Sequence, residues 1–179
     1  MYRTLPDILS ISRIVLALVL PLTEPLSVIF FAVLAIGCLT DVLDGYFARR
    51  FDAFSPYGPT LDSIADLVLA TSLLYCIIPT IDWEWWMIIW MAAIAAVRLI
   101  AFLLGSVKYG RAAFVHTYLN KLAGVLFFLS PFLIVLLGDT FTVAIVCGVS
   151  SVSTAEYLFV NLHNKTYEPN FRTALIPRS

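Results

Sequence analysis

The hydrophobic positions of this chain fall into long runs that are separated by short polar segments. Helices of about 20 predominantly apolar residues are typical of membrane spans. We expect six of them, and they cover residues 8–22, 26–39, 61–78, 83–104, 121–137 and 140–160. The second helix continues into a polar stretch that ends near residue 51. The sequence therefore predicts an all-α, polytopic membrane protein with six transmembrane helices.

Shorter segments flank these predicted helices at both ends of the chain. Residues 1–7 combine apolar side chains with one arginine, which favours a short interfacial segment. Residues 161–179 are polar and are expected to form a tail. We therefore predict one membrane domain over residues 1–160, followed by a cytoplasmic C-terminal tail. Cys38, Cys76 and Cys147 stand far apart in apolar runs, which indicates buried thiols rather than metal ligands or disulfides.

Charge is distributed unevenly between the two sides of this predicted fold. The turns opposite the N-terminus carry only acidic residues, whereas the basic residues gather on the N-terminal side: Arg3, Arg13, Arg49, Arg50, Lys108, Arg111, Lys121, Lys165, Arg172 and Arg178. Cytoplasmic loops of membrane proteins are enriched in lysine and arginine, so both termini are expected in the cytoplasm. The composition, 61% hydrophobic with a formal net charge of −1, argues against a nucleic-acid partner.

Four aspartates lie where the second predicted helix ends and the third begins. Asp41 and Asp44 are three residues apart and Asp62 and Asp66 four apart, so each pair occupies one helix face. Serine, proline and glycine between the pairs predict a turn that brings the two helices together. Carboxylate oxygens suit Mg²⁺ or Mn²⁺, and four carboxylates can hold two ions that share a phosphoryl group. We expect such a metal site at the cytoplasmic membrane edge.

Small residues and an arginine accompany the aspartates. Gly45 and Ala48 lie one turn apart, which leaves room for a flat ligand such as a nucleobase. The guanidinium of Arg49 can bind a diphosphate through two hydrogen bonds. Gly58 permits close approach of a ligand at the turn. The stretch from Asp41 to Asp66 therefore favours a nucleotide diphosphate as ligand.

The same stretch resembles the signature of the CDP-alcohol phosphotransferase (phosphatidyltransferase) family, D-x2-D-G-x2-A-R-x8-G-x3-D-x3-D, at all eight fixed positions. The N-terminal segment is also similar to phosphatidylglycerophosphate synthases. The resemblance implies a homodimeric enzyme, in a bacterial or archaeal cell membrane, that transfers a substituted phosphate from a CDP-linked lipid such as CDP-diacylglycerol to an alcohol and releases CMP. It also implies that Asp66 completes the metal site and acts as general base, and that CDP is bound by Asp41, Gly45, Ala48, Arg49, Gly58 and Asp62.

A second polar cluster is a candidate site for the alcohol acceptor: Arg98, Arg111, His116, Asn120 and Lys121. Arg98 lies about 20 Å along the fourth predicted helix, where a charge is costly and usually functional. His116 and Asn120 share one helix face. Several cations suit an acceptor that carries its own phosphate, so glycerol 3-phosphate is the first candidate and phosphatidylglycerophosphate the product. Inositol phosphate, serine or another alcohol remain alternatives.

Two other functions are compatible with an aspartate cluster in a membrane. A prenyl-diphosphate enzyme also binds a diphosphate through aspartate-held magnesium, but its motifs lack the glycine, alanine and arginine positions found here. A divalent-cation transporter would distribute acids towards the membrane centre, whereas these four aspartates lie at one edge. Release of CMP from a CDP-lipid distinguishes the enzyme from both alternatives.

Overall fold

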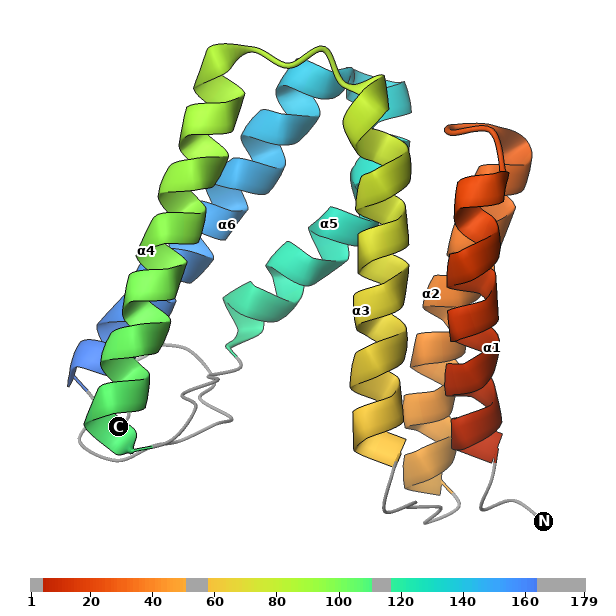
Figure 1. Cartoon of the computed structure of the whole chain (residues 1–179), viewed down its shortest axis with the longest axis horizontal. Helices are drawn as coiled ribbons and strands as arrows, with labels where there is room; N and C mark the ends of the chain where they lie inside the picture. The colour runs from red at the N-terminus through yellow and green to blue at the C-terminus, as the bar shows by residue number, and fades with distance from the viewer. Residues whose placement is uncertain (1–4, 51–57, 111–116, 164–179) are drawn as a thin grey trace. The chain divides into compact units, whose positions relative to one another are not determined.

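The computed structural model describes residues 5–50, 58–110 and 117–163 of the chain (Figure 1). These residues are helical and contain no β-strand, which confirms the all-α prediction. The α-helices are α1 (Leu5–Val19), α2 (Val28–Arg50), α3 (Gly58–Ile77), α4 (Trp85–Tyr109), α5 (Tyr118–Leu137) and α6 (Asp139–His163), and two 3₁₀ turns, η2 (Leu20–Leu22) and η3 (Ile78–Thr80), follow α1 and α3.

Five of these helices, α2 to α6, are long and apolar enough to cross a membrane. Helix α1 has only 15 residues, so the first of the six predicted spans stays a prediction. Residues 5–7 of the predicted interfacial segment form the first turn of α1, and residues 1–4 lie outside the described part of the chain. Helix α6 extends to His163, three residues into the predicted tail.

The chain divides by its contacts into two compact units, Met1–Ile81 and Asp82–Ser179, which are described separately. In the first unit, α1 packs against both α2 and α3. Buried residues recur at helical spacing along all three helices, and they form one packed seam. They are Ser10, Arg13 and Ala17 of α1 with Leu20 of η2; Phe30, Leu34, Gly37, Thr40 and Asp44 of α2; and Ala65, Leu69 and Leu73 of α3. The seam is apolar at one end and ionic at the other.

Gly37 of α2 faces the side chain of Leu69 of α3 within this seam. A Cβ added at Gly37 would lie 3.4 Å from both terminal methyl carbons of Leu69. The missing side chain at Gly37 therefore leaves room for the side chain of Leu69.

In the second unit, α6 packs against α4 and α5. Ala101, Tyr157 and Val160 form a small buried core between α4 and α6. A single residue, Gly138, separates α5 from α6, and its backbone has φ 80° and ψ 166°. This conformation is almost restricted to glycine, so Gly138 makes the sharp reversal possible.

Polar contacts satisfy the backbone of α5 at its first turn and next to its internal proline. Its N-cap is Thr117, whose hydroxyl accepts a hydrogen bond from the backbone N–H of Asn120 at 3.2 Å. Pro131 lies inside the helix and has no N–H to donate to the carbonyl of Phe127. The hydroxyl of Ser130 donates to the carbonyl oxygen of Phe127 at 2.7 Å. This oxygen therefore has a hydrogen-bond donor although Pro131 cannot provide one.

Candidate active site

The four predicted aspartates meet at the ionic end of the first unit. Asp41 and Asp44 lie in the last turns of α2, and Asp62 and Asp66 in the first turns of α3. One carboxylate oxygen from each of Asp41, Asp62 and Asp66 lies within 4.8 Å of the others. The structure therefore brings together aspartates that are 25 residues apart in the chain, as the paired helical spacing predicts.

Asp44 differs from the other three aspartates in its surroundings. Its side chain is 9% exposed, whereas those of Asp41, Asp62 and Asp66 are 51%, 43% and 48% exposed. The hydroxyl of Ser10 on α1 donates to Asp44 Oδ2 at 3.4 Å. Asp44 is thus held in the helix seam, while the other three carboxylates remain accessible to a ligand.

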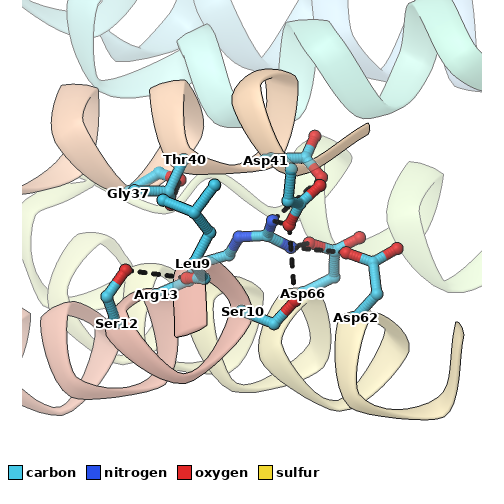
Figure 2. Close-up of polar contacts among 10 residues, drawn as sticks. Leu9, Ser10, Ser12, Arg13, Gly37, Thr40, Asp41, Asp62 and Asp66 are labelled. Atoms are coloured by element: carbon cyan, nitrogen blue, oxygen red, sulfur yellow. Dashed lines mark hydrogen bonds and ion pairs between the residues drawn. The ribbon is translucent and has the colours of Figure 1, made fainter. Parts of the chain in front are cut away.

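An arginine that the sequence analysis assigned only to charge asymmetry lies among these carboxylates. The side chain of Arg13 is fully buried and makes ion pairs with all four aspartates. Its Nη1 donates to Asp62 Oδ1 at 2.8 Å and to Asp66 Oδ1 at 2.6 Å. Its Nη2 lies 3.3 Å from Asp41 Oδ1 and donates to Asp44 Oδ2. Figure 2 shows the guanidinium reaching from α1 towards the carboxylates of α2 and α3.

Arg13 is therefore part of the site, a role that the charge pattern of the sequence did not predict. It lies in the middle of α1, on the same buried stripe as Ser10 and Ala17. The signal that could have identified it is a charged side chain within an apolar helix, because such a charge requires a partner. Ser10 carries no comparable signal, since serine is common in membrane helices.

The chemistry of the donor set fits a divalent metal ion. Asp41, Asp62 and Asp66 offer several carboxylate oxygens at close range, and such hard ligands suit Mg²⁺ or Mn²⁺. Among the described residues, this group contains no cysteine or histidine that would favour zinc. Asp44 pairs with Arg13 as these three aspartates do, and it remains a predicted metal ligand.

The residues predicted to surround CDP are described only in part. Gly45 lies in α2, one residue after Asp44, and Gly58 is the first residue of α3. Ala48 and Arg49 belong to α2, but their side chains lie outside the described part of the structure. The turn over residues 51–57 is likewise outside it. The bounds of α2 and α3 agree with the two helices predicted on either side of these residues.

The second unit brings two of the predicted acceptor residues together. Arg98 on α4 donates through Nη2 to Asn120 Oδ1 on α5 at 2.7 Å and to Ser153 Oγ on α6 at 3.2 Å. Ser153 is fully buried and was not predicted from the sequence, because a serine in an apolar run carries no distinctive pattern. One guanidinium therefore ties all three helices of this unit together.

Of the other three predicted acceptor residues, the structure describes Lys121 alone. Lys121 is exposed on α5, and its Nζ lies 5.9 Å from the centre of the Tyr118 ring. Arg111 and His116 lie outside the described residues. Lys108, which the sequence analysis assigned to charge asymmetry, donates through Nζ to the carbonyl oxygens of Asn161 and Leu162 at 3.0 and 2.7 Å.

Comparisons with known proteins agree with this geometry. A model of the CDP-alcohol phosphatidyltransferase family matches residues 3–155, more than four-fifths of the chain, so the protein belongs to that family. A cardiolipin synthase (CMP-forming)/mitochondrial hydrolase fusion protein of Schizosaccharomyces pombe is 40% identical over 80 residues. That alignment covers 41% of this chain and 13% of the relative. No solved structure matches the chain.

Membership in this family establishes the general class of the protein. The family is described as that of the CDP-alcohol phosphatidyltransferases, and five helices of the described residues are long and apolar enough to span a membrane. The partial match to the yeast fusion protein supports the same class. The resemblance inferred from the eight positions between Asp41 and Asp66 is thereby confirmed at the level of the family.

Proposed function

We propose that this protein transfers a phosphatidyl group from a CDP-linked lipid, such as CDP-diacylglycerol, to an alcohol and releases CMP. The observation that carries the proposal is the convergence of Asp41, Asp62 and Asp66 within 4.8 Å, in a chain of the CDP-alcohol phosphatidyltransferase family. The printed name of the yeast relative, a CMP-forming synthase, supports CMP as the leaving group.

The four aspartates are proposed to hold up to two Mg²⁺ or Mn²⁺ ions. When bound, such ions neutralise the oxygens of the diphosphate and polarise the phosphorus that is attacked. Asp41, Asp44 and Asp62 would serve as ligands, and Asp66 would complete the set. The exposure of Asp41, Asp62 and Asp66 supports their part in metal binding, because an ion can reach them, whereas the role of Asp44 rests on the family signature.

Asp66 is proposed to be the general base. The acceptor hydroxyl must lose a proton as its oxygen forms a bond to phosphorus and the bond to CMP breaks. The Asp66 side chain is 48% exposed, so a carboxylate oxygen is within reach of an acceptor from outside the helix seam. The proton passes to Asp66, and CMP leaves as an anion.

The CDP group is proposed to lie along α2 and the start of α3. The carboxylates of Asp41 on α2 and Asp62 on α3 lie within 4.8 Å of each other, and Gly45 and Gly58 carry no side chain that would hinder a ligand nearby. Ala48 and Arg49 follow on α2 and would contact the nucleotide and its diphosphate. These roles rest on the family signature and on the helix positions.

Glycerol 3-phosphate is our first candidate for the acceptor. Its phosphate would require cations, and the Arg98, Asn120 and Ser153 network provides a guanidinium that is already oriented by two hydrogen bonds. Arg111, His116 and Lys121 remain proposed contributors. Inositol phosphate and serine are alternatives that the following experiment separates.

The membrane arrangement is also part of the proposal. We propose six spans within one catalytic domain over residues 1–160, both termini and the acid site on the cytoplasmic side, and a homodimer in a bacterial or archaeal cell membrane. The uneven distribution of basic residues supports the orientation. Light scattering of the purified protein in detergent tests the dimer, and one copy per micelle would contradict it.

An acceptor screen tests the function directly. Purified protein is mixed with CDP-diacylglycerol, Mg²⁺ or Mn²⁺, and one of glycerol 3-phosphate, inositol phosphate, inositol, serine or phosphatidylglycerol, and CMP is measured. We expect CMP release that requires glycerol 3-phosphate and is abolished by a metal chelator. Failure of every alcohol to release CMP would refute the transferase, and metal flux in proteoliposomes without a CDP-lipid would favour a transporter.

A further inference from the structure

Arg13 has a position that the proposed transfer reaction does not by itself explain. Its guanidinium is fully buried and pairs with all four aspartates. One positive charge against four carboxylates leaves the cluster with a formal charge of −3. The arginine therefore reduces the repulsion among the acids without neutralising it, and a strong attraction for further cations remains.

The oxygens that bind Arg13 belong to the same carboxylates that are suited to metal. Asp62 and Asp66 each use Oδ1 for Nη1, and Asp41 uses Oδ1 for Nη2. A metal ion held by oxygen lies about 2.0 to 2.6 Å from its ligands. An ion bound by these three carboxylates would thus lie within a few ångströms of a guanidinium, and two cations so close repel each other strongly.

We propose that Arg13 is a resident counter-cation of the aspartate cluster and that a divalent metal ion must displace its guanidinium in order to bind. The proposal rests on the proposed function only in that these aspartates bind metal. It assigns to α1 the control of metal affinity, because Arg13 is the residue through which α1 contacts the carboxylates of both α2 and α3.

The remaining hydrogen bonding of Arg13 is compatible with displacement. Its Nε is buried but has no hydrogen-bond partner, so the guanidinium is held through Nη1 and Nη2 alone. These two nitrogens bind only the aspartates among the described contacts. A structural arginine usually has its Nε satisfied as well. Loss of the carboxylate contacts would therefore release the whole head group of Arg13.

Binding of Mn²⁺ alone to the full-length protein tests this proposal. Arg13→Gln removes the charge, Arg13→Lys keeps it with fewer donors, and Arg50→Gln is the control because Arg50 is exposed at the end of α2. We expect Arg13→Gln to bind Mn²⁺ about ten-fold more tightly than wild type or better, since a nearby like charge is removed. Arg13→Lys should fall between them, and Arg50→Gln should remain close to wild type.

Equal or weaker Mn²⁺ binding by Arg13→Gln would overturn the proposal. If that variant does not fold, wild-type protein provides a second measurement, the labelling of Arg13 by an arginine-directed reagent, followed by mass spectrometry. Displacement predicts faster labelling with Mn²⁺ than without it, and unchanged or slower labelling contradicts displacement. Wild-type protein that binds Mn²⁺ but releases no CMP would refute the proposed function and leave this inference intact.

Discussion

Asp66 combines the two properties that a general base at this site requires. Its carboxylate belongs to the group that can hold a metal ion, and nearly half of its side chain is exposed to a ligand. The other exposed members, Asp41 and Asp62, are proposed as metal and CDP ligands from their resemblance to the family signature. Asp66 is therefore the carboxylate whose removal should affect the chemical step most directly.

We predict that Asp66→Asn lowers kcat at least about 100-fold, because asparagine cannot accept the proton of the acceptor hydroxyl. Binding of CDP-diacylglycerol, measured through protection against thermal unfolding, should persist. Glu24→Gln is the control, since it neutralises an exposed carboxylate in the turn before α2. Wild-type turnover by Asp66→Asn would exclude the residue as the base.

Arg98 allows a second prediction about the acceptor. We expect Arg98→Gln to raise the KM for glycerol 3-phosphate by about ten-fold or more, because charged hydrogen bonds contribute about 1.5 to 3 kcal/mol. The KM for the CDP-lipid should not change. Lys108→Gln removes the same charge from the same helix, but Lys108 bonds backbone carbonyls near the end of α6. An equal rise in KM for both variants would argue against a direct role for Arg98.

The sequence predicts the acidic residues of the site better than their cationic partner. Paired spacing places Asp41 with Asp44 and Asp62 with Asp66 on helix faces, and this follows from helical geometry alone. Arg13 could not be assigned a partner in the same way, because its contacts join residues 28 to 53 positions apart. Such contacts depend on how three helices pack, which a local pattern does not encode.

At the scale of elements, helix existence follows from the apolar runs, but the packed seam does not. Lipid-facing positions of a membrane helix are as apolar as its buried ones, so the apolar pattern alone does not show which side of such a helix is buried. Exposed Ile8, Ile11 and Val15 alternate with buried Ser10 and Arg13 along α1. Polar residues therefore mark the buried side here, which reverses the pattern of a soluble helix.

The reversal between α5 and α6 gives a prediction at this scale. Gly138→Ala should destabilise the protein by about 1 to 3 kcal/mol, because φ 80° and ψ 166° are strained for any residue with a side chain. An added Cβ meets nothing within 4 Å at Gly138 or at Gly124, which lies inside α5. Gly124→Ala should therefore stabilise the helix by up to about 1 kcal/mol.

Thermal unfolding of the two variants in detergent checks this pair. Neither added Cβ clashes with a neighbouring atom. Changes of opposite sign in the free energy of unfolding would therefore identify the backbone conformation at residue 138 as the cause. Two shifts of the same sign would show that the reversal at residue 138 does not constrain the helix pair.

At the scale of the whole molecule, the family match extends over parts of both units. The first unit carries the aspartates and Arg13, and the second carries the Arg98 network. Donor and acceptor residues are thus proposed to lie in different units. Which alcohol is used could not be predicted from the sequence, because no local motif in the second unit defines it.

The orientation in the membrane is testable in the full chain. In a background with Cys38, Cys76 and Cys147 replaced by alanine, we introduce Glu24→Cys in the turn before α2 or Thr60→Cys at the start of α3. A membrane-impermeant maleimide should label Glu24→Cys in sealed right-side-out vesicles and Thr60→Cys only after permeabilisation, because basic residues favour the cytoplasmic side. The reverse labelling would invert the topology.

The place of Arg13 in the chain also affects how the protein is made. Arg13 precedes all four aspartates, so a ribosome synthesises the cation first. Asp41 and Asp44 follow with the second helix, and Asp62 and Asp66 arrive with the third. A carboxylate near the membrane is costly unless a partner is close. In the proposed membrane arrangement, the order of synthesis therefore places the positive charge of Arg13 in the chain before either acidic helix is made.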